Sequence, residues 1–207
     1  MGKIVLATII ISGSAKWLLK VGGNKEKWYG SDRIFMYVMT VFGAMTVNYS
    51  EQCTEYGWVV SNLRLLAGCL LAGGLLSAAY MDRRNCWVYN YVWWWCLPWA
   101  GILGMTAGGE FSGIVAVLVF VMLQQLLFSR MYGKADCHAF SVCALAECGN
   151  AVGMVGFLLQ MFLSVVLLTI VQLFRGNVTP RGRLREPQPF IPYIITCLLY
   201  TSPSPRD

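Results

Sequence analysis

The feature that most constrains this chain is a series of long apolar runs, separated by short polar segments that carry nearly all of the charge. The run at 113–129, "GIVAVLVFVMLQQLLFS", contains no charged residue. A helix that is apolar on every side must be surrounded by lipid or protein, and about 18 mostly apolar residues are long enough to cross a bilayer. Only 13% of the residues are charged, whereas soluble domains carry about 25%. We therefore predict an all-α membrane protein.

Each apolar run predicts one membrane-crossing helix, and together they predict a polytopic helix bundle. Residues 1–57 form an N-terminal extension of one or two helices, and residues 58–196 form a core of six helices. The candidate 4–19 is weaker than the others, because Lys16 and small polar residues interrupt it. The remaining candidates are 34–49, 58–81, 91–107, 113–129, 137–148 joined tightly to 152–174, and 190–196.

Residues 197–207, "CLLYTSPSPRD", have a different origin. The peptide matches, codon for codon, the translation of one frame of a widely used transposase sequencing adapter. We therefore expect that the natural reading frame is cut after about Thr196 and that residues 197–207 carry no information about the fold. The apolar residues 190–196 are then the start of a helix whose remainder is missing.

Small residues and tryptophans predict how the helices pack. The "GGLL" near 73 and "GILGMTAGG" near 101 supply glycines, which let helices approach closely in lipid. Four tryptophans gather near one end of the 91–107 run and predict an interfacial aromatic belt; they are Trp93, Trp94, Trp95 and Trp99.

The loops of the core alternate in charge. The segments "GGEFS" near 110 and "ECGN" near 148 contain no Lys or Arg. The other loops of the core are basic, and basic loops stay in the cytoplasm. We therefore place on the cytoplasmic side the loops that contain Arg83, Arg84, Arg130, Lys134, Arg175, Arg181, Arg183 and Arg185. The net charge of +6 is read as a topology signal. Since the basic residues form no continuous face, we predict no nucleic-acid partner.

Two aspartates lie at cytoplasmic ends of predicted core helices. Asp82 follows the run 58–81, and Asp136 opens the run 137–148. Ionisable residues at membrane depth are costly and raise a functional hypothesis. Two carboxylates that share one proton can act as a general base on water and a general acid on a peptide carbonyl, which is aspartic-protease chemistry. The alternative is that each aspartate only pairs with a neighbouring arginine or lysine.

The segment from Asp82 resembles the first active-site motif of the small prepilin peptidases, written roughly D-x-R-x-x-x-I-P-N. Asp82, Arg84, Val88 and Asn90 stand at the matching positions, while Tyr89 replaces the proline.

Two later segments resemble the same family. "GKAD", Gly133–Asp136, is similar to the G-x-G-D-x-K motif of the GxGD membrane aspartyl proteases, with Ala135 in place of the second glycine and His138 in place of the lysine. "FIPYI", which contains Pro192, resembles the proline-containing motif that opens the final helix of this family. The three motifs occur in the family's order, with the expected helices between them.

The resemblance implies a type IV prepilin leader peptidase, an aspartyl endopeptidase in a prokaryotic cytoplasmic (inner) membrane. Asp82 and Asp136 would be the catalytic pair, facing the cytoplasm, and the other matching residues would support the motifs. The implied partners are the lipid bilayer and a pilin-like precursor, whose short basic leader is cut after a glycine. No cofactor is implied. The spacing of the eight cysteines and one histidine matches no metal site.

Three alternatives remain open. The first is an inactive homologue, because Ala135 has less backbone freedom than the glycine that it replaces. A protease of the signal-peptide-peptidase kind is less consistent, because Met81 stands where that group has tyrosine and no Pro-Ala-Leu motif is present. A non-enzymatic channel or transporter would use the aspartates along an ion path, with deeper polar residues such as Gln124 and Gln125.

Overall fold

The computed structural model describes residues 2–22, 30–52, 57–106, 111–126, 133–146, 151–174 and 191–192. The regular structure within these ranges is entirely helical, so the predicted all-α class is confirmed. The helices, in chain order, are α1 (Gly2–Val21), α2 (Gly30–Gln52), α3 (Trp58–Asn85), α4 (Asn90–Thr106), α5 (Phe111–Leu126), α6 (Lys134–Ala146) and α7 (Ala151–Phe174).

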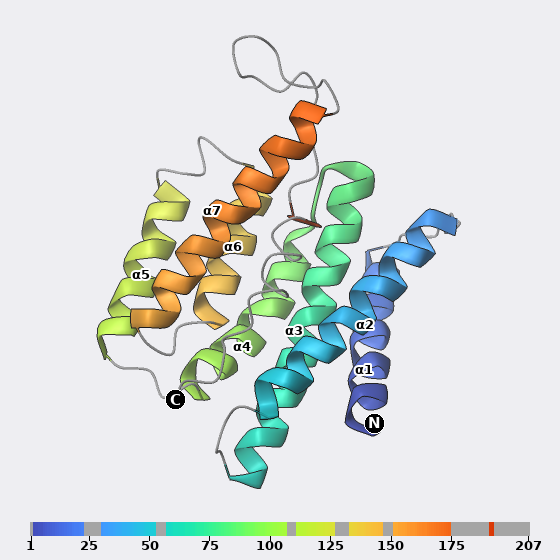
Figure 1. The fold of residues 1–207 in the computed structure, drawn as a ribbon, viewed down its shortest axis with the longest axis horizontal. Coiled ribbons are helices and arrows are strands. Elements are labelled where there is room, and N and C mark those ends of the chain that lie inside the picture. The colour runs from blue at the N-terminus through green and yellow to red at the C-terminus, as the bar shows by residue number, and fades with distance from the viewer. Residues whose placement is uncertain are drawn as a thin grey trace.

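Helix α3 connects the two halves of the bundle. It packs against α1 and α2 on one side and against α4 on the other. Helix α4 in turn packs against α6, which contacts α5 and α7. Figure 1 shows this order across the molecule, with α1 and α2 at one edge, α3 and α4 in the middle, and α5 to α7 at the opposite edge.

Two glycines in the middle of α3 let its neighbours come close. A Cβ at Gly73 would overlap the Ser14 hydroxyl and lie 2.9 Å from the Ile11 carbonyl oxygen, both on α1. A Cβ at Gly74 would overlap the Cys96 sulfur on α4. Small residues allow helix backbones to approach in this way, so the close packing predicted near residue 73 is confirmed.

The N-terminal extension is attached to the core by side chains of α4. The Tyr91 hydroxyl donates a hydrogen bond to the Leu18 carbonyl at the end of α1, at 2.9 Å. The rings of Trp17 and Trp95 lie 5.2 Å apart between centroids. Residues 1–57 therefore contribute two helices, α1 and α2, and both pack against α3.

The opposite half is joined by an aromatic contact and a buried amide. Phe120 of α5 meets Phe157 of α7 edge to face, with ring centroids 5.3 Å apart. One turn along α5, Gln124 is fully buried, and its amide nitrogen lies 3.6 Å from the sulfur of Met161. These contacts bury the inner faces of α5 and α7.

The tryptophans of α4 do not form one interfacial belt. Trp94 is 74% exposed, as a belt requires, but Trp93 is 5% exposed and belongs to the core. Successive residues on a helix point about 100° apart, so neighbouring tryptophans cannot share one face. The aromatic-belt prediction is therefore wrong for Trp93.

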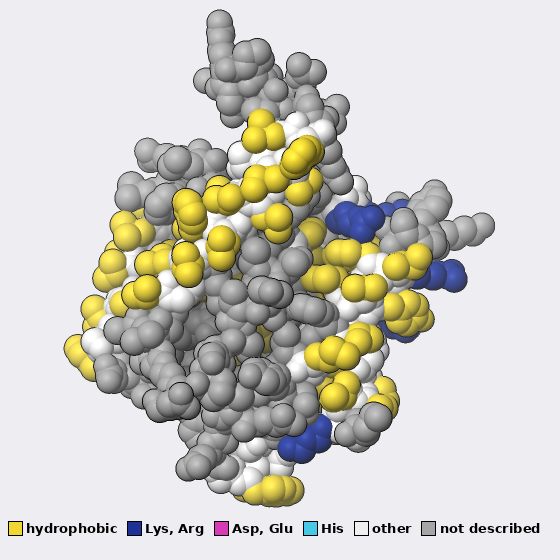
Figure 2. Space-filling model, viewed as in Figure 1, with side chains coloured by type: hydrophobic (Ala, Val, Ile, Leu, Met, Phe, Trp, Pro, Cys, Tyr) yellow, Lys and Arg dark blue, Asp and Glu magenta, His cyan; other side chains and the backbone are white. Residues whose placement is uncertain are grey.

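Within the part of the chain that the structure describes, two helices, α1 and α3, are long and apolar enough to cross a membrane by length and composition. Helix α1 contains the candidate 4–19, which the sequence ranked as weaker. Large hydrophobic side chains are also exposed on the outer helices; they include Leu118 and Met122 on α5 and Phe162, Leu173 and Phe174 on α7. Figure 2 shows hydrophobic side chains over much of the described part of one face, with Lys and Arg towards its margins.

Several predictions fall outside the described residues. They concern the adapter-derived segment 197–207, most of the final run 190–196, the basic loop at 175–185 and the loop containing Arg130.

Candidate active site

Asp82 lies in the last turn of α3 and is only 6% exposed. Its Oδ2 atom accepts a hydrogen bond from the main-chain N–H of Ile191 at 2.9 Å. Its own carbonyl accepts the N–H of Cys86 at 2.9 Å, and Cys86 ends the helix in the left-handed conformation with φ 50°. The helix therefore ends within one turn of the aspartate, and a distant segment of the chain contacts its carboxylate.

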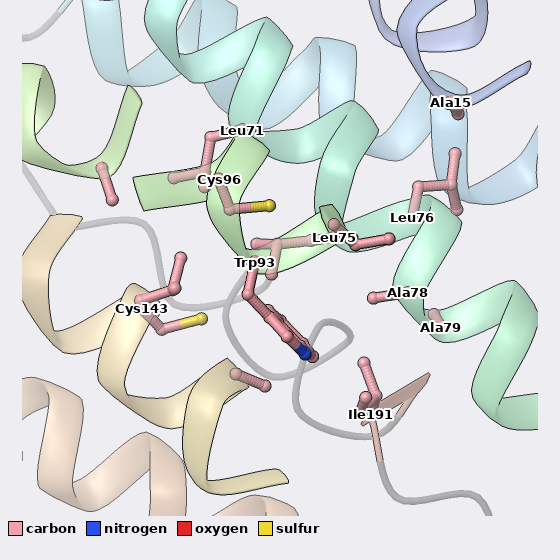
Figure 3. Close-up of a cluster of buried hydrophobic side chains, with 14 of the residues drawn as sticks. Ala15, Leu71, Leu75, Leu76, Ala78, Ala79, Trp93, Cys96, Cys143 and Ile191 are labelled. Atoms are coloured by element: carbon pink, nitrogen blue, oxygen red, sulfur yellow. The ribbon is translucent and has the colours of Figure 1, made fainter. Parts of the chain in front are cut away.

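The segment that contacts Asp82 belongs to the hydrophobic core. Ile191 is fully buried. Figure 3 draws it in the same cluster as Ala78, Ala79 and Trp93, which come from α3 and α4. Figure 1 shows the short segment beside the end of α3 that carries Asp82. The isoleucine side chain thus anchors the main chain whose N–H meets the carboxylate.

Asp136 lies in the first turn of α6, ahead of its apolar residues and outside the two helices that are long enough to cross a membrane. Gly133 precedes the helix and its carbonyl accepts the N–H groups of Asp136 and Cys137, at 3.1 and 3.2 Å. The Asp136 carboxylate folds back over this glycine and receives a backbone hydrogen bond from it. A Cβ at Gly133 would lie 3.2 Å from Oδ2 of Asp136. Gly133, the glycine of the "GKAD" segment, therefore makes room for the Asp136 carboxylate.

The two carboxylates influence each other electrostatically. Burial and, to a smaller extent, the negative charge of Asp82 together raise the pKa of Asp136 from 3.8 to about 7. The hydrogen bond from Gly133 opposes this rise but does not cancel it. Burial and the charge of Asp82 also raise the pKa of the Cys86 thiol. Two aspartates that are 54 positions apart in the sequence therefore lie within range of each other's charge.

The arginines next to Asp82 make contacts of their own. The guanidinium of Arg83 lies over the ring of Phe35 on α2, 4.9 Å from its centroid. Arg84 donates a hydrogen bond to the Tyr80 hydroxyl at 3.1 Å, one turn earlier on α3. These contacts direct both guanidinium groups to aromatic partners.

The other residues of the motifs have different surroundings. Asn90 is exposed at the start of α4. Ala135 is partly buried and packs against the hydrophobic core. His138 is half-buried, with its ring 6.0 Å from that of Trp93. Pro192 directly follows the isoleucine that contacts Asp82, and it is partly buried.

Two contacts of this region were not predicted from the sequence. The isoleucine before Pro192 contributes a main-chain N–H, which no residue type can signal. Gln125 lies with its amide nitrogen 3.4 Å from Nδ1 of His138 and 3.4 Å from the Ser141 hydroxyl. The polarity of Gln125 within an apolar run was visible, but its partners on α6 were not.

Within the described ranges, no group of three or more His, Cys, Asp or Glu side chains is arranged to hold a metal ion.

Comparisons of the chain with protein-family models, with curated proteins and with solved structures found no match.

Proposed function

We propose that this chain is a membrane-embedded aspartyl endopeptidase with a multi-pass, six-helix core. The observation that carries the proposal is the pair of buried or partly buried carboxylates at the end of α3 and the start of α6. The pKa of Asp136, raised to about 7, suits a group that holds a proton near neutral pH and then donates it.

The chemistry proposed for the pair is hydrolysis of a peptide bond by an activated water. One carboxylate accepts a proton from the water while the other, protonated, donates to the carbonyl oxygen of the scissile bond. Burial excludes bulk water and strengthens these interactions. No cofactor is needed for this reaction.

The substrate class follows from the resemblance of the three motifs to prepilin peptidases. We propose a pilin-like precursor, cut after a glycine at the end of its basic leader, at the cytoplasmic face of a prokaryotic membrane. The apolar outer surfaces of α5 and α7 support a lipid environment.

Cleavage of a model precursor by the full chain in lipid vesicles tests this proposal. The precursor carries a short basic leader that ends in glycine, followed by an apolar helix. We expect one cut after the glycine, lost in Asp82→Asn and in Asp136→Asn. Lys134→Gln, an exposed change in the same turn of α6 as Asp136, should retain cleavage.

Each other outcome contradicts part of the proposal. Cleavage that survives either asparagine substitution removes the catalytic pair. No cleavage by a folded chain favours an inactive homologue.

The ion-path alternative has less support from the described residues. The buried Ser77 of α3 donates its hydroxyl to the Gly74 carbonyl at 2.7 Å, and Ser141 of α6 donates to the Cys137 carbonyl at 2.8 Å. Both hydroxyls thus donate to a carbonyl of their own helix, and Ser141 also accepts from the Gln125 amide of α5 at 3.4 Å.

A further inference from the structure

We infer that the two aspartates have fixed and different roles, with Asp82 as the base, held by the main-chain N–H of Ile191, and Asp136 as the acid. This inference rests on the proposed function. It also assigns Ile191 as a positioning residue, which acts through Asp82 without touching the substrate.

The first support is the bond to Asp82. The N–H of Ile191 donates to Oδ2 at 2.9 Å, and both groups are buried. A donor that cannot itself accept favours the ionised form of a carboxylate. Hydrogen bonds to charged groups are also stronger than those between neutral groups. The negative charge of the pair is therefore held on Asp82.

The second support is the surroundings of Asp136. This carboxyl is partly buried and lies within the field of Asp82, whose charge opposes a second negative charge. Both effects raise the pKa of Asp136, whereas the backbone hydrogen bond from Gly133 lowers it. The proton of the pair is therefore held on Asp136.

Among the described residues, the titratable and charged groups on the neighbouring elements make contacts of their own. On α3, Arg83 contacts Phe35 and Arg84 contacts Tyr80. In the segment after α3, the Cys86 thiol is neutral below its raised pKa. On α6, the exposed Lys134 lies near His138, which contacts Trp93 of α4. Tyr89, just before α4, and Tyr91 of α4 stack on each other with ring centroids 5.9 Å apart.

The division specifies each proton in the reaction. Ionised Asp82 takes a proton from water as the oxygen attacks the peptide carbonyl carbon, and Asp136 gives its proton to the carbonyl oxygen. This forms a neutral gem-diol, with Asp82 protonated and Asp136 ionised. When the C–N bond breaks, Asp82 returns its proton to the leaving nitrogen and Asp136 takes one from a diol hydroxyl. Both groups are then back in their starting states.

The test replaces the amide at Ile191 by an ester, through incorporation of the matching hydroxy acid. This removes the N–H and keeps the side chain. The matched control is the same change at Val92, whose N–H donates to the Tyr89 carbonyl at 3.1 Å. Activity on the model precursor is measured against pH. Infrared spectroscopy measures the carboxylic-acid band against pH independently of activity.

In the unaltered protein, we expect a carboxylic-acid band that persists to near neutral pH, is absent from Asp136→Asn and remains in Asp82→Asn. The ester at Ile191 should move the acid side of the activity profile upward by about one to two pH units, the size expected from losing a bond to a charged group. The ester at Val92 should leave this limb unchanged.

Two results would overturn the assignment: loss of the persistent band in Asp82→Asn instead of Asp136→Asn, or an acid limb that the Ile191 ester does not move. If the unaltered protein does not cleave the precursor, the proposed function fails. The infrared titration then still shows which aspartate carries the proton.

Discussion

Replacing Asp136 by asparagine should stabilise the protein at alkaline pH more than at acidic pH. The folded chain raises the pKa of this carboxyl from 3.8 to about 7, first through burial and then through the charge of Asp82. At about pH 5 the folded protein keeps this proton while the unfolded chain loses it, which favours the folded state. As the pH rises through about 7, the folded protein must ionise a partly buried group, and this advantage is lost.

The size of the effect follows from the pKa difference. The effect of the change from 3.8 to about 7 is complete only below pH 3.8, so the interval from about pH 5 to about pH 8 samples about two pKa units, or roughly 2.7 kcal/mol at about 1.4 kcal/mol for each unit. Because Asp136 is only partly buried, water screens it and we expect about half of this value, roughly 1.3 kcal/mol. For a chain of this length, that difference corresponds to about 3 to 5 °C in Tm.

The assay is thermal unfolding in lipid nanodiscs at about pH 5 and about pH 8, on either side of the transition. The Tm of Asp136→Asn relative to the unaltered protein should be higher at the alkaline pH. The control is Leu118→Ala, an exposed change on α5 that involves no ionisable group, for which we expect no pH dependence. An equal Tm difference for Asp136→Asn at both pH values would refute the argument from burial and the neighbouring charge.

Three further substitutions test the packing around the site. Gly73→Ala should lower the free energy of unfolding by about 1 to 3 kcal/mol, because its Cβ would overlap α1. The control Gly101→Ala, where a Cβ meets nothing within 4 Å, should not lower it. Equal unfolding curves for the two variants would contradict this prediction. Cys86→Gly should raise stability by about 1 kcal/mol, because φ is 50° there; an unchanged Tm would show no strain. Gly133→Ala should reduce cleavage about tenfold by displacing the Asp136 carboxylate, which would lie 3.2 Å from the new Cβ; unchanged kcat/KM would contradict that role.

The helices could be predicted because their signal is local. The run 91–107 became α4, Asn90–Thr106, and the run 152–174 became α7, Ala151–Phe174. Continuous apolar residues between polar segments define such helices without knowledge of their neighbours. The weakest candidate, 4–19, lies in α1, and its interruptions are explained by packing: Ser14 is buried and donates its hydroxyl to the Ile11 carbonyl at 3.0 Å.

The directions of side chains around each helix could not be predicted in the same way. Three consecutive tryptophans of α4 have three different environments. Trp93 lies near His138, Trp94 is exposed, and Trp95 lies near Trp17 of α1. When all residues of a run are apolar, no polar face indicates which side meets protein and which meets lipid.

The sequence by itself determined the helical class, most helix boundaries, and the placement of Asp82 and Asp136 at helix ends, because these depend on residues adjacent in the chain. Only the tertiary structure decided that the two aspartates influence each other and that the N–H of Ile191, 109 positions from Asp82, meets its carboxylate. A main-chain donor is the same for almost every residue type. Its partner is therefore set by packing, here by the burial of the Ile191 side chain against the core.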